Sequence, residues 1–166
     1  MSKLIMLRGN SGCGKSTIAR LLQHELGRGT LMIPQDTVRR ELLWVNDRPD
    51  NPAVRLMENL LRYGFSQCEY VILEGILYAD YYKSLFDRAK SLFGSNIHAY
   101  YFDIPFAETV ARHQGKPNAH EFGEAQMRSW WREKDLLPDI EEQMITIDMT
   151  KEDIIARILR DIGANR

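Results

Sequence analysis

The sequence predicts an α/β fold in which a parallel five-stranded sheet is covered by helices on both faces. Five short apolar runs alternate with stretches of helical periodicity along the chain. The runs lack the in–out alternation of strands with one solvated face, and this is typical of parallel strands buried on both sides. A glycine-rich segment follows the first run directly. Such sheets bind their ligands at the carboxyl ends of their strands, so this segment is the first candidate for a binding site.

The five strands are predicted from apolar runs bounded by turn or helix signals. They span residues 3–8, 30–34, 70–74, 98–103 and 144–148. The helices between them have apolar residues three and four positions apart, so one face of each is expected to be buried. In chain order these apolar faces consist of Ile18, Leu21, Leu22 and Leu26; Met57, Leu60, Leu61 and Phe65; Tyr82, Leu85, Phe86, Ala89 and Leu92; and Ile154, Ile155, Ile158, Leu159 and Ile162.

Local signals mark two helix ends. Gly94 follows the third apolar face, at a position where glycine commonly terminates a helix. Thr150 and Asp153 have the spacing of a capping box, in which each side chain bonds the backbone N–H of the other residue. We therefore expect one helix to end at Gly94 and the last helix to begin after Thr150.

The composition is that of one globular domain spanning residues 1–166. Apolar residues make up 44% of the chain and charged residues 27%, so one sizeable core is expected. The formal net charge of −1 provides no basic field to attract a polynucleotide. No apolar run reaches the roughly 20 residues of a membrane span, and the two cysteines, Cys13 and Cys68, indicate no disulfide framework. We expect a cytoplasmic protein without membrane contact.

The segment after the first strand fills every fixed position of the phosphate-binding P-loop, G-x-x-x-x-G-K-[ST]. Its glycines let backbone N–H groups turn toward the phosphates of a nucleotide. Lys15 reaches the β- and γ-phosphates, and the Ser16 hydroxyl binds Mg²⁺. We expect ATP and Mg²⁺ to bind here, with contacts from Gly9, Asn10, Ser11, Gly12, Cys13, Gly14, Lys15, Ser16 and Thr17.

Asp36 lies just after the second strand and is followed by Arg39 and Arg40. Its carboxylate can be a general base that accepts the proton of a substrate hydroxyl, while Arg39 on the same helical face holds a substrate anion. Asp36 can also be the N-cap of a helix that starts at Thr37, and the two roles are compatible. We count Asp36, Arg39 and Arg40 as candidate substrate-binding residues.

Acidic residues also end the third and fourth strands. Glu74 follows apolar residues and is expected to face the ligand crevice, where a carboxylate can orient the water shell of Mg²⁺. A salt bridge to a nearby cation is its alternative role. Asp103 is followed by Pro105, which suits the first turn of a helix, so we expect Asp103 at a helix start.

Residues 112–135 are expected to form a mobile lid over the transferring phosphate. Arg112 opens a stretch with glycine, proline and basic residues, which suits a closing segment. Arg112 can supply positive charge to the transition state, with Lys116, Arg128 or Arg132 as a second donor. A solvated loop with scattered charges is the alternative.

Aromatic residues flank the segments expected to form the pocket for the second substrate. There they can stack on a ring or pack in the core. They are Trp44, Tyr78, Tyr81, Trp130 and Trp131.

The P-loop, the Asp36-x-x-Arg39 pair and the segment from Glu108 to Arg112 resemble those of small P-loop kinases. Over nearly its whole length the chain is similar to the group that contains the zeta toxins, the chloramphenicol phosphotransferases and the kinase domain of phage polynucleotide kinase. Phe122-Gly123-Glu124 and the Trp130-Trp131 pair resemble an uncharacterised bacterial branch of this group.

This resemblance implies a sheet in the order 2-3-1-4-5. It also implies that Asp36 is the general base, that Arg39 binds a substrate phosphate and that Arg112 begins the lid. The segments 40–59 and 75–83 do not match the antibiotic-binding or nucleotide-sugar-binding members of the group. The acceptor of the phosphoryl group is therefore left open.

These observations predict a kinase that transfers the γ-phosphoryl group of ATP to a hydroxyl of a small molecule, with Lys15, Asp36 and Arg112 as catalytic residues. A polynucleotide 5′-hydroxyl kinase is one alternative, for which Arg39 and Arg40 are the local hint. A nucleotide-binding regulator or NTPase is another, although the chain lacks the N-K-x-D base-recognition sequence of G proteins. A toxin-like kinase with a neutralising partner protein is a third.

Overall fold

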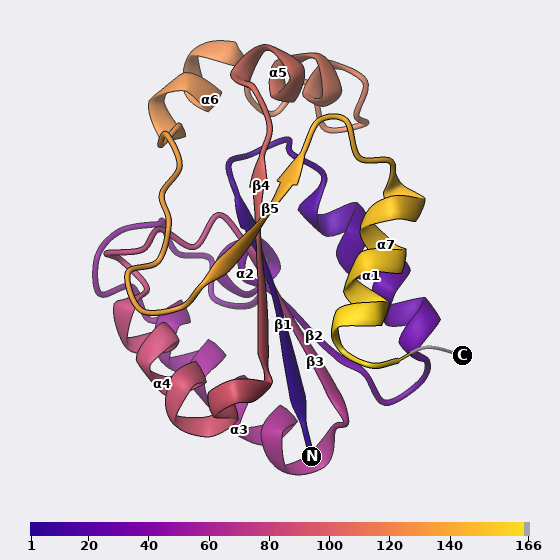
Figure 1. Cartoon of the computed structure of the whole chain (residues 1–166). Coiled ribbons are helices and arrows are strands. Elements are labelled where there is room, and N and C mark those ends of the chain that lie inside the picture. Colours follow the sequence, from indigo (N-terminus) through magenta and orange to yellow (C-terminus); the bar gives the residue numbers. More distant parts are fainter. Residues whose placement is uncertain (165–166) are drawn as a thin grey trace.

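Five parallel strands form the centre of the structure, a computed structural model that describes residues 1–164 (Figure 1). Their order is β2-β3-β1-β4-β5, which confirms the predicted fold class and strand order. The strands are β1 (Lys3–Gly9), β2 (Leu31–Pro34), β3 (Tyr70–Gly75), β4 (Ile97–Asp103) and β5 (Glu142–Thr146). Residues 165 and 166, the last two of the expected domain, lie outside the described residues.

Helices cover both faces of this sheet. The helices α3 (Ala53–Gln67) and α4 (Lys83–Phe93) lie on one face, and α1 (Lys15–Leu26) and α7 (Lys151–Asp161) on the other (Figure 1). The connections contain α2 (Gln35–Thr37), the π-helical turn η1 (Val38–Leu42), the 3₁₀ turn η2 (Gly94–Asn96), α5 (Phe106–Gln114) and α6 (Glu124–Trp130). Within residues 1–164, no helix has both the length and the apolar character needed to cross a bilayer.

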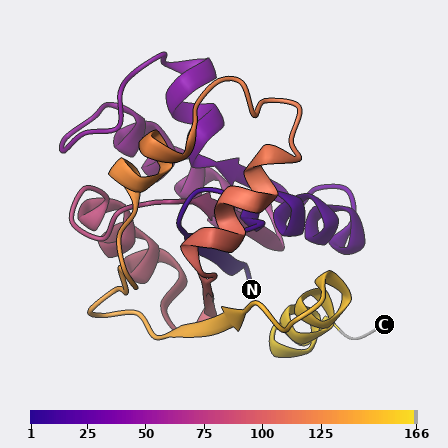
Figure 2. The same ribbon diagram turned by 90° about the horizontal axis from the view of Figure 1, so that it is seen from above.

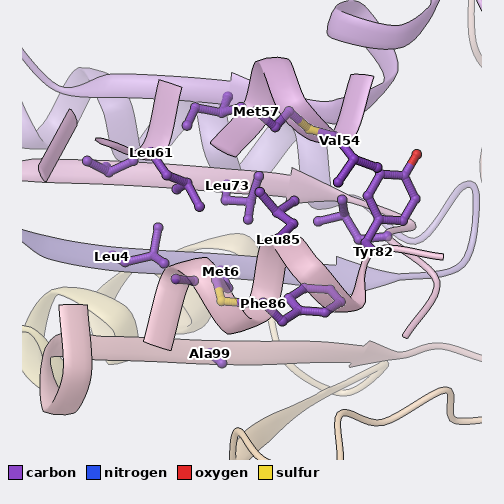
Figure 3. Close-up of a cluster of buried hydrophobic side chains, with 14 of the residues drawn as sticks. Leu4, Met6, Val54, Met57, Leu61, Leu73, Tyr82, Leu85, Phe86 and Ala99 are labelled. Carbon is purple, nitrogen blue, oxygen red and sulfur yellow. The ribbon is translucent and has the colours of Figure 1, made fainter. Parts of the chain in front are cut away.

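Alternate residues of the central strand face the two helical layers, as the pleat of a strand requires. Leu4 and Met6 pack with α3 and α4, in a cluster that also contains Leu73 and Met57 (Figure 3). Ile5 and its neighbours on the opposite face pack with α1 and α7. β1 is therefore buried on both sides, and its carboxyl end is held rigidly at the point where the glycine-rich loop begins.

In two helices, one residue that was predicted to lie on the buried apolar face is exposed. Leu21 of α1 is exposed, and Ala19 takes its place against the sheet. Phe65 of α3 is also exposed, and its neighbour Gly64 is buried instead. A Cβ atom at Gly64 would lie only 2.6 Å from a methyl carbon of Val71, so no larger residue fits at this crossing.

Both predicted helix ends are confirmed. Gly94 is the C-cap of α4, with a φ of 54°. The Thr150 hydroxyl accepts a hydrogen bond from the Asp153 backbone N–H at 3.1 Å, and the Asp153 carboxylate accepts one from the Thr150 N–H at 3.0 Å. β5 begins two residues earlier than predicted, and its last residue, Thr146, lies opposite Asp103 at the end of β4.

A fully buried arginine joins the first strand to the last strand and to the segment that follows α6. Arg8 donates hydrogen bonds to the Glu142 carboxylate at 2.7 Å, to the Asp135 carbonyl at 2.8 Å and to the Leu77 carbonyl at 2.9 Å. The Glu142 side chain is itself only 1% exposed. The edge strand β5 and the chain returning from α6 are thus tied to the centre of the sheet by one guanidinium group.

The carboxyl ends of the strands all point toward α5 and α6. Figure 1 shows these two helices beyond the ends of β1 and β4, and Figure 2 shows α5 crossing above the sheet with α6 beside it. The loops after β1, β2 and β3 open on the same side, so every candidate residue from the sequence gathers at this end of the molecule.

Candidate active site

The P-loop connects β1 directly to α1, which begins at Lys15. Gly12 and Gly14 have φ angles of 80° and 97°, in the left-handed region that side chains disfavour. A Cβ atom at Gly12 would also lie 2.8 Å from the Thr109 carbonyl oxygen. Glycine is therefore needed at both positions for the loop to close in this shape.

The Lys15 side chain folds back over the loop. Its ammonium donates to the Asn10 carbonyl at 2.8 Å and lies 3.3 Å from the Cys13 sulfur. The side chains of Lys15 and Cys13 are buried, whereas Ser16 and Thr17 are exposed in the first turn of α1. One positive charge is thus held against the backbone of the glycine-rich loop, where a P-loop lysine can reach bound phosphates.

Ser16 and Glu74 meet at the bottom of the loop. The Ser16 hydroxyl donates to a Glu74 carboxylate oxygen at 3.0 Å. Burial raises the pKa of Glu74 above its ordinary value, and the negative charge of Asp36 adds to this, while Lys15 and the Ser16 hydrogen bond act in the opposite direction. The charge of Asp36 therefore reaches the buried carboxylate beneath the P-loop.

The Ser16–Glu74 pair fits Mg²⁺ as a ligand set. Mg²⁺ typically takes one or two protein oxygens and completes its octahedron with phosphate oxygens and water. Among residues 1–164, no cluster of three or more histidine, cysteine or acidic side chains has the geometry of a metal cage. A hydroxyl and a buried carboxylate beside a phosphate loop are the oxygen donors that such an open site requires.

Asp36 lies in the second position of α2, and the N-cap of that helix is Pro34. The prediction that Asp36 caps a helix starting at Thr37 is therefore wrong, because the helix begins immediately after β2. The Asp36 carboxylate instead accepts from Arg39 at 2.9 Å and from Arg40 at 3.4 Å. Arg39 also donates to the Val45 carbonyl at 3.0 Å, so its terminal nitrogens are already engaged.

A cleft of about 750 Å³ contains both the P-loop and Asp36. Its lining contains Lys15, Ser16 and Glu74 together with Asp36, Arg39 and Arg40. The structure thus brings together the phosphate-binding loop and the residues after β2, which are separated by about 20 positions in sequence. This cleft is the candidate active site.

Arg112 lies in the last turn of α5 and contacts the P-loop from outside the cleft lining. It donates to the Cys13 carbonyl at 3.2 Å and to the Glu108 carboxylate at 2.9 Å. Asp103, by contrast, remains in β4 and pairs with Lys134 at 3.3 Å. The prediction that Asp103 starts a helix is wrong, since α5 begins at Phe106 with Pro105 as its N-cap.

The segment expected to be a lid consists of the end of α5, a connection, α6 and the chain returning toward β5. His113 is buried at its base, where the Nε2–H donates to the Phe122 carbonyl at 2.8 Å and the ring stacks on that of Phe122. Lys116 lines the cleft. Burial lowers the pKa of Lys116, and the positive charges of Lys15 and Arg112 lower it further.

The return of this segment is fastened to the cleft walls. The Asn10 side chain donates to the Arg132 carbonyl at 2.7 Å and accepts from the Arg132 N–H at 3.0 Å. The Tyr78 hydroxyl donates to the Trp130 carbonyl at 2.7 Å. Glu121 of the lid segment pairs with Arg40 at 3.5 Å. Asn10 thus has a structural partner that the P-loop pattern does not reveal.

Four of the five candidate aromatic residues line the cleft: Tyr78, Tyr81, Trp130 and Trp131. Trp44 does not, and its side chain is 91% exposed. Tyr78 and Tyr81 meet edge to face, and the Arg132 guanidinium lies 3.9 Å from the centre of the Tyr78 ring.

Sequence reasoning missed two polar residues that line the cleft, Gln35 and Asp47. The Asp47 carboxylate accepts from the Tyr82 hydroxyl at 2.7 Å, and Gln35 donates to the same hydroxyl at 2.9 Å. Asp47 belongs to a run of polar and proline residues that is typical of a surface turn, so its pattern gave no sign of a buried partner.

A family model described as an AAA domain matches residues 4–137, which is most of the chain. The chain belongs to this family. A comparison with curated proteins gives no significant match.

Solved structures that include two kinases have the same fold over almost the whole chain. A gluconokinase from Sinorhizobium meliloti is 13% identical, with a TM-score of 0.69, covering 98% of this chain and 92% of its own. The tunicamycin resistance protein of Deinococcus radiodurans is 16% identical, with a TM-score of 0.68 and coverage of 98% and 96%. The APS kinase of Mycobacterium tuberculosis, solved with AMPPNP and APS, is 19% identical, with a TM-score of 0.63 and coverage of 99% and 98%.

At such identities the likeness establishes the fold and leaves the substrate open. The chain therefore has the fold of small P-loop kinases. The narrower resemblance to zeta toxins and chloramphenicol phosphotransferases stays a prediction.

Proposed function

We propose that the protein transfers the γ-phosphoryl group of ATP to a hydroxyl group of a small-molecule acceptor. The single observation that carries this proposal is that Lys15, Ser16 and Asp36 line one cleft. A nucleotide regulator needs only the phosphate-binding residues. A phosphotransferase also needs a residue for the acceptor, because donor and acceptor have to be aligned before the phosphoryl group moves.

At the donor end, the P-loop N–H groups and Lys15 would hold the β- and γ-phosphates. Ser16 and Glu74 would hold Mg²⁺, which neutralises phosphate charge during transfer. Arg112 already bonds the loop backbone, and Lys116 lines the cleft beside it. Both cations are close enough to the loop to stabilise negative charge on the phosphoryl group when the lid is closed.

At the acceptor end, Asp36 would accept the proton of the attacking hydroxyl. Arg39 and Arg40 hold its two carboxylate oxygens, and they would thereby orient the carboxylate toward the acceptor. Both arginines would therefore act on the acceptor indirectly, by orienting Asp36. The AAA-domain family match and the kinase fold support the same reaction class.

A small acceptor is favoured over a polynucleotide by the cover on the cleft. Asn10 and Tyr78 fasten the return of the lid segment to the cleft walls, and Glu121 of the lid segment pairs with Arg40. A bound strand would have to enter through this cover, and the net charge of −1 offers it no general attraction. We also propose a cytoplasmic location, since Cys13 and Cys68 are both free thiols.

The test is transfer of label from γ-labelled ATP into a panel of metabolites, antibiotics and oligonucleotides. We expect label in a small alcohol, and we expect Lys15→Ala to abolish it because the loop loses its phosphate-binding charge. Release of label only as inorganic phosphate would instead indicate an NTPase without an acceptor. Label in oligonucleotides, with a steep dependence on salt, would indicate a polynucleotide kinase.

A further inference from the structure

The arginines at the acceptor end of the cleft are all paired with carboxylates. Arg39 and Arg40 both bond Asp36, and Arg40 also pairs with Glu121. Arg132 pairs with Asp80 at 2.6 Å and with Asp135 at 3.8 Å. The remaining nitrogen of Arg39, Nε, is buried and out of reach of a ligand. An anionic acceptor that binds an arginine here would therefore compete with carboxylates that are already in place.

Asp47 differs from these arginines, because its carboxylate has no counter-ion among the described residues. Within residues 1–164, no lysine, arginine or histidine nitrogen lies within ion-pair distance of its carboxylate, although it lines the cleft. The carboxylate is nevertheless held in place. The buried Tyr82 hydroxyl donates to one oxygen at 2.7 Å, and the Gln35 amide lies 3.4 Å from the other.

The support beneath Asp47 is rigid. Tyr82, Gln35 and Asn51 are at most 2% exposed, and the Gln35 and Asn51 side chains both bond the Tyr82 hydroxyl. Burial and the bond to Asp47 raise the pKa of Tyr82, so the phenol remains a donor to the carboxylate. A fixed carboxylate without a counter-ion is a preorganised site for a positively charged or strongly hydrogen-bonding group.

Two tyrosines line the cleft together with this carboxylate. Burial raises the pKa of the Tyr78 phenol to about 12, and the negative charge of Asp47 adds to this. Tyr78 and Tyr81 form an edge-to-face pair that lines the same cleft. The Arg132 guanidinium lies 3.9 Å from the centre of the Tyr78 ring and 5.1 Å from that of the Tyr81 ring, so both rings already have a cationic neighbour. The carboxylate of Asp47, rather than the ring faces, is therefore the group that would select an ammonium group.

From this geometry we infer that the acceptor is an amino alcohol: its hydroxyl is phosphorylated near Asp36, and its protonated amine binds Asp47. The inference rests on the proposed function for the hydroxyl, and it adds the charge class of the acceptor. The phosphoryl transfer itself is unchanged. The hydroxyl oxygen forms the new bond to phosphorus, the bond to the β-phosphate oxygen breaks to leave ADP, and the hydroxyl proton passes to Asp36.

The experiment measures both equilibrium binding and phosphate transfer for matched triplets of alcohols. Each triplet contains an aminosugar or aminocyclitol, the same molecule with a hydroxyl in place of the amine, and the corresponding carboxylate. Binding is measured calorimetrically on the AMPPNP-loaded protein, so it does not depend on turnover. We expect amines to bind about tenfold more tightly than their hydroxyl counterparts, and carboxylates to bind most weakly.

Three variants assign this preference to Asp47. Asp47→Asn removes the charge but retains an oxygen that can accept from Tyr82, and it should erase the preference for amines. Asp47→Glu retains the charge and should keep part of the preference. Asp50→Asn changes an exposed carboxylate on the same segment, whose positive φ of 58° asparagine tolerates, and it should change nothing.

The outcomes separate this inference from the proposed function. Transfer to neutral or anionic alcohols, with amines no better in wild type or unaffected in Asp47→Asn, overturns the inference and leaves the kinase intact. Amine binding that depends on Asp47 without any phosphate transfer supports the inferred site and removes the proposed activity. Failure of every amine to bind also overturns the inference.

Discussion

At the scale of single residues, we expect the ionised carboxylate of buried Glu74 to destabilise the free protein and to stabilise the enzyme loaded with Mg²⁺ and nucleotide. Its pKa is raised chiefly by burial, so the ionised form is costly while no cation is bound. A carboxyl group with a raised pKa retains its proton in the folded protein at a pH where the unfolded chain has lost it. Its contribution to stability is therefore present below the ordinary value of 4.5 and declines as the pH rises through the raised pKa.

Glu74→Gln should remove this pH dependence, because the amide is neutral and its oxygen can still accept from Ser16. Melting temperatures measured against pH, without nucleotide, should show the variant to be more stable than wild type by a few degrees at neutral pH. The difference should shrink on acidification. With Mg·ATP the order should reverse, since only the carboxylate can support the metal. If Glu74→Gln is less stable than wild type at neutral pH, the ionised carboxylate of Glu74 does not destabilise the free protein.

At the scale of elements, α5 connects the lid to the phosphate loop. Arg112 sits at the end of that helix and bonds the Cys13 carbonyl, while buried His113 fastens the next segment through Phe122. The positive charge of Arg112 therefore stays near the phosphate loop only if α5 keeps its position over that loop. The proposed role of Arg112 is electrostatic, and it is separate from the structural role of His113.

Arg112→Met should therefore lower the transfer rate by about 10² to 10³ at saturating ATP, the cost of losing one preorganised transition-state donor. Arg128→Met is the matched control, because Arg128 lies over the Phe106 ring at 3.4 Å on the neighbouring lid helix, whereas Arg112 bonds the P-loop backbone. Stopped-flow measurement of single-turnover transfer distinguishes the two variants. Equal losses in both would assign the effect to lid stability in general.

The elements also show where sequence reasoning succeeds and where it fails. Gly94 and the Thr150–Asp153 box are local signals, so the helix ends they mark were predictable. Gly64, rather than Phe65, is buried next to Val71 of another element, a contact that helical periodicity does not contain. The N-cap prediction for Asp36 failed for a similar reason, since a helix beginning directly after β2 made Pro34 the cap.

At the scale of the whole molecule, Arg8 holds distant parts of the chain in one arrangement. It pairs with Glu142, which is 134 positions away in sequence, and with Asp135 at the end of the lid segment. Its partners could not be predicted, although a charged residue in an apolar strand was a visible signal. The strands and the P-loop were predictable because each follows from a local pattern. The pairing of Asp47 with Tyr82 was not.

Arg8→Met should destabilise the protein by about 3 to 5 kcal/mol, because it leaves the Glu142 carboxylate buried without its partner. The double variant Arg8→Met, Glu142→Met should recover most of this loss, since an apolar pair of similar volume avoids the unpaired charge. Chemical denaturation of the two single variants and the double variant gives the coupling free energy. Additive losses in the double variant would show that the pair does not act as a unit.

The central claim is that the P-loop and Asp36 are the two ends of one phosphotransfer site. Its most direct test is to measure ATP affinity and phosphate transfer together in Asp36→Asn, with the best alcohol acceptor from the labelling panel. We predict that transfer falls by about 10² to 10⁴, the usual contribution of a general base, while ATP affinity stays at the wild-type value. Near-normal transfer in Asp36→Asn would contradict the account.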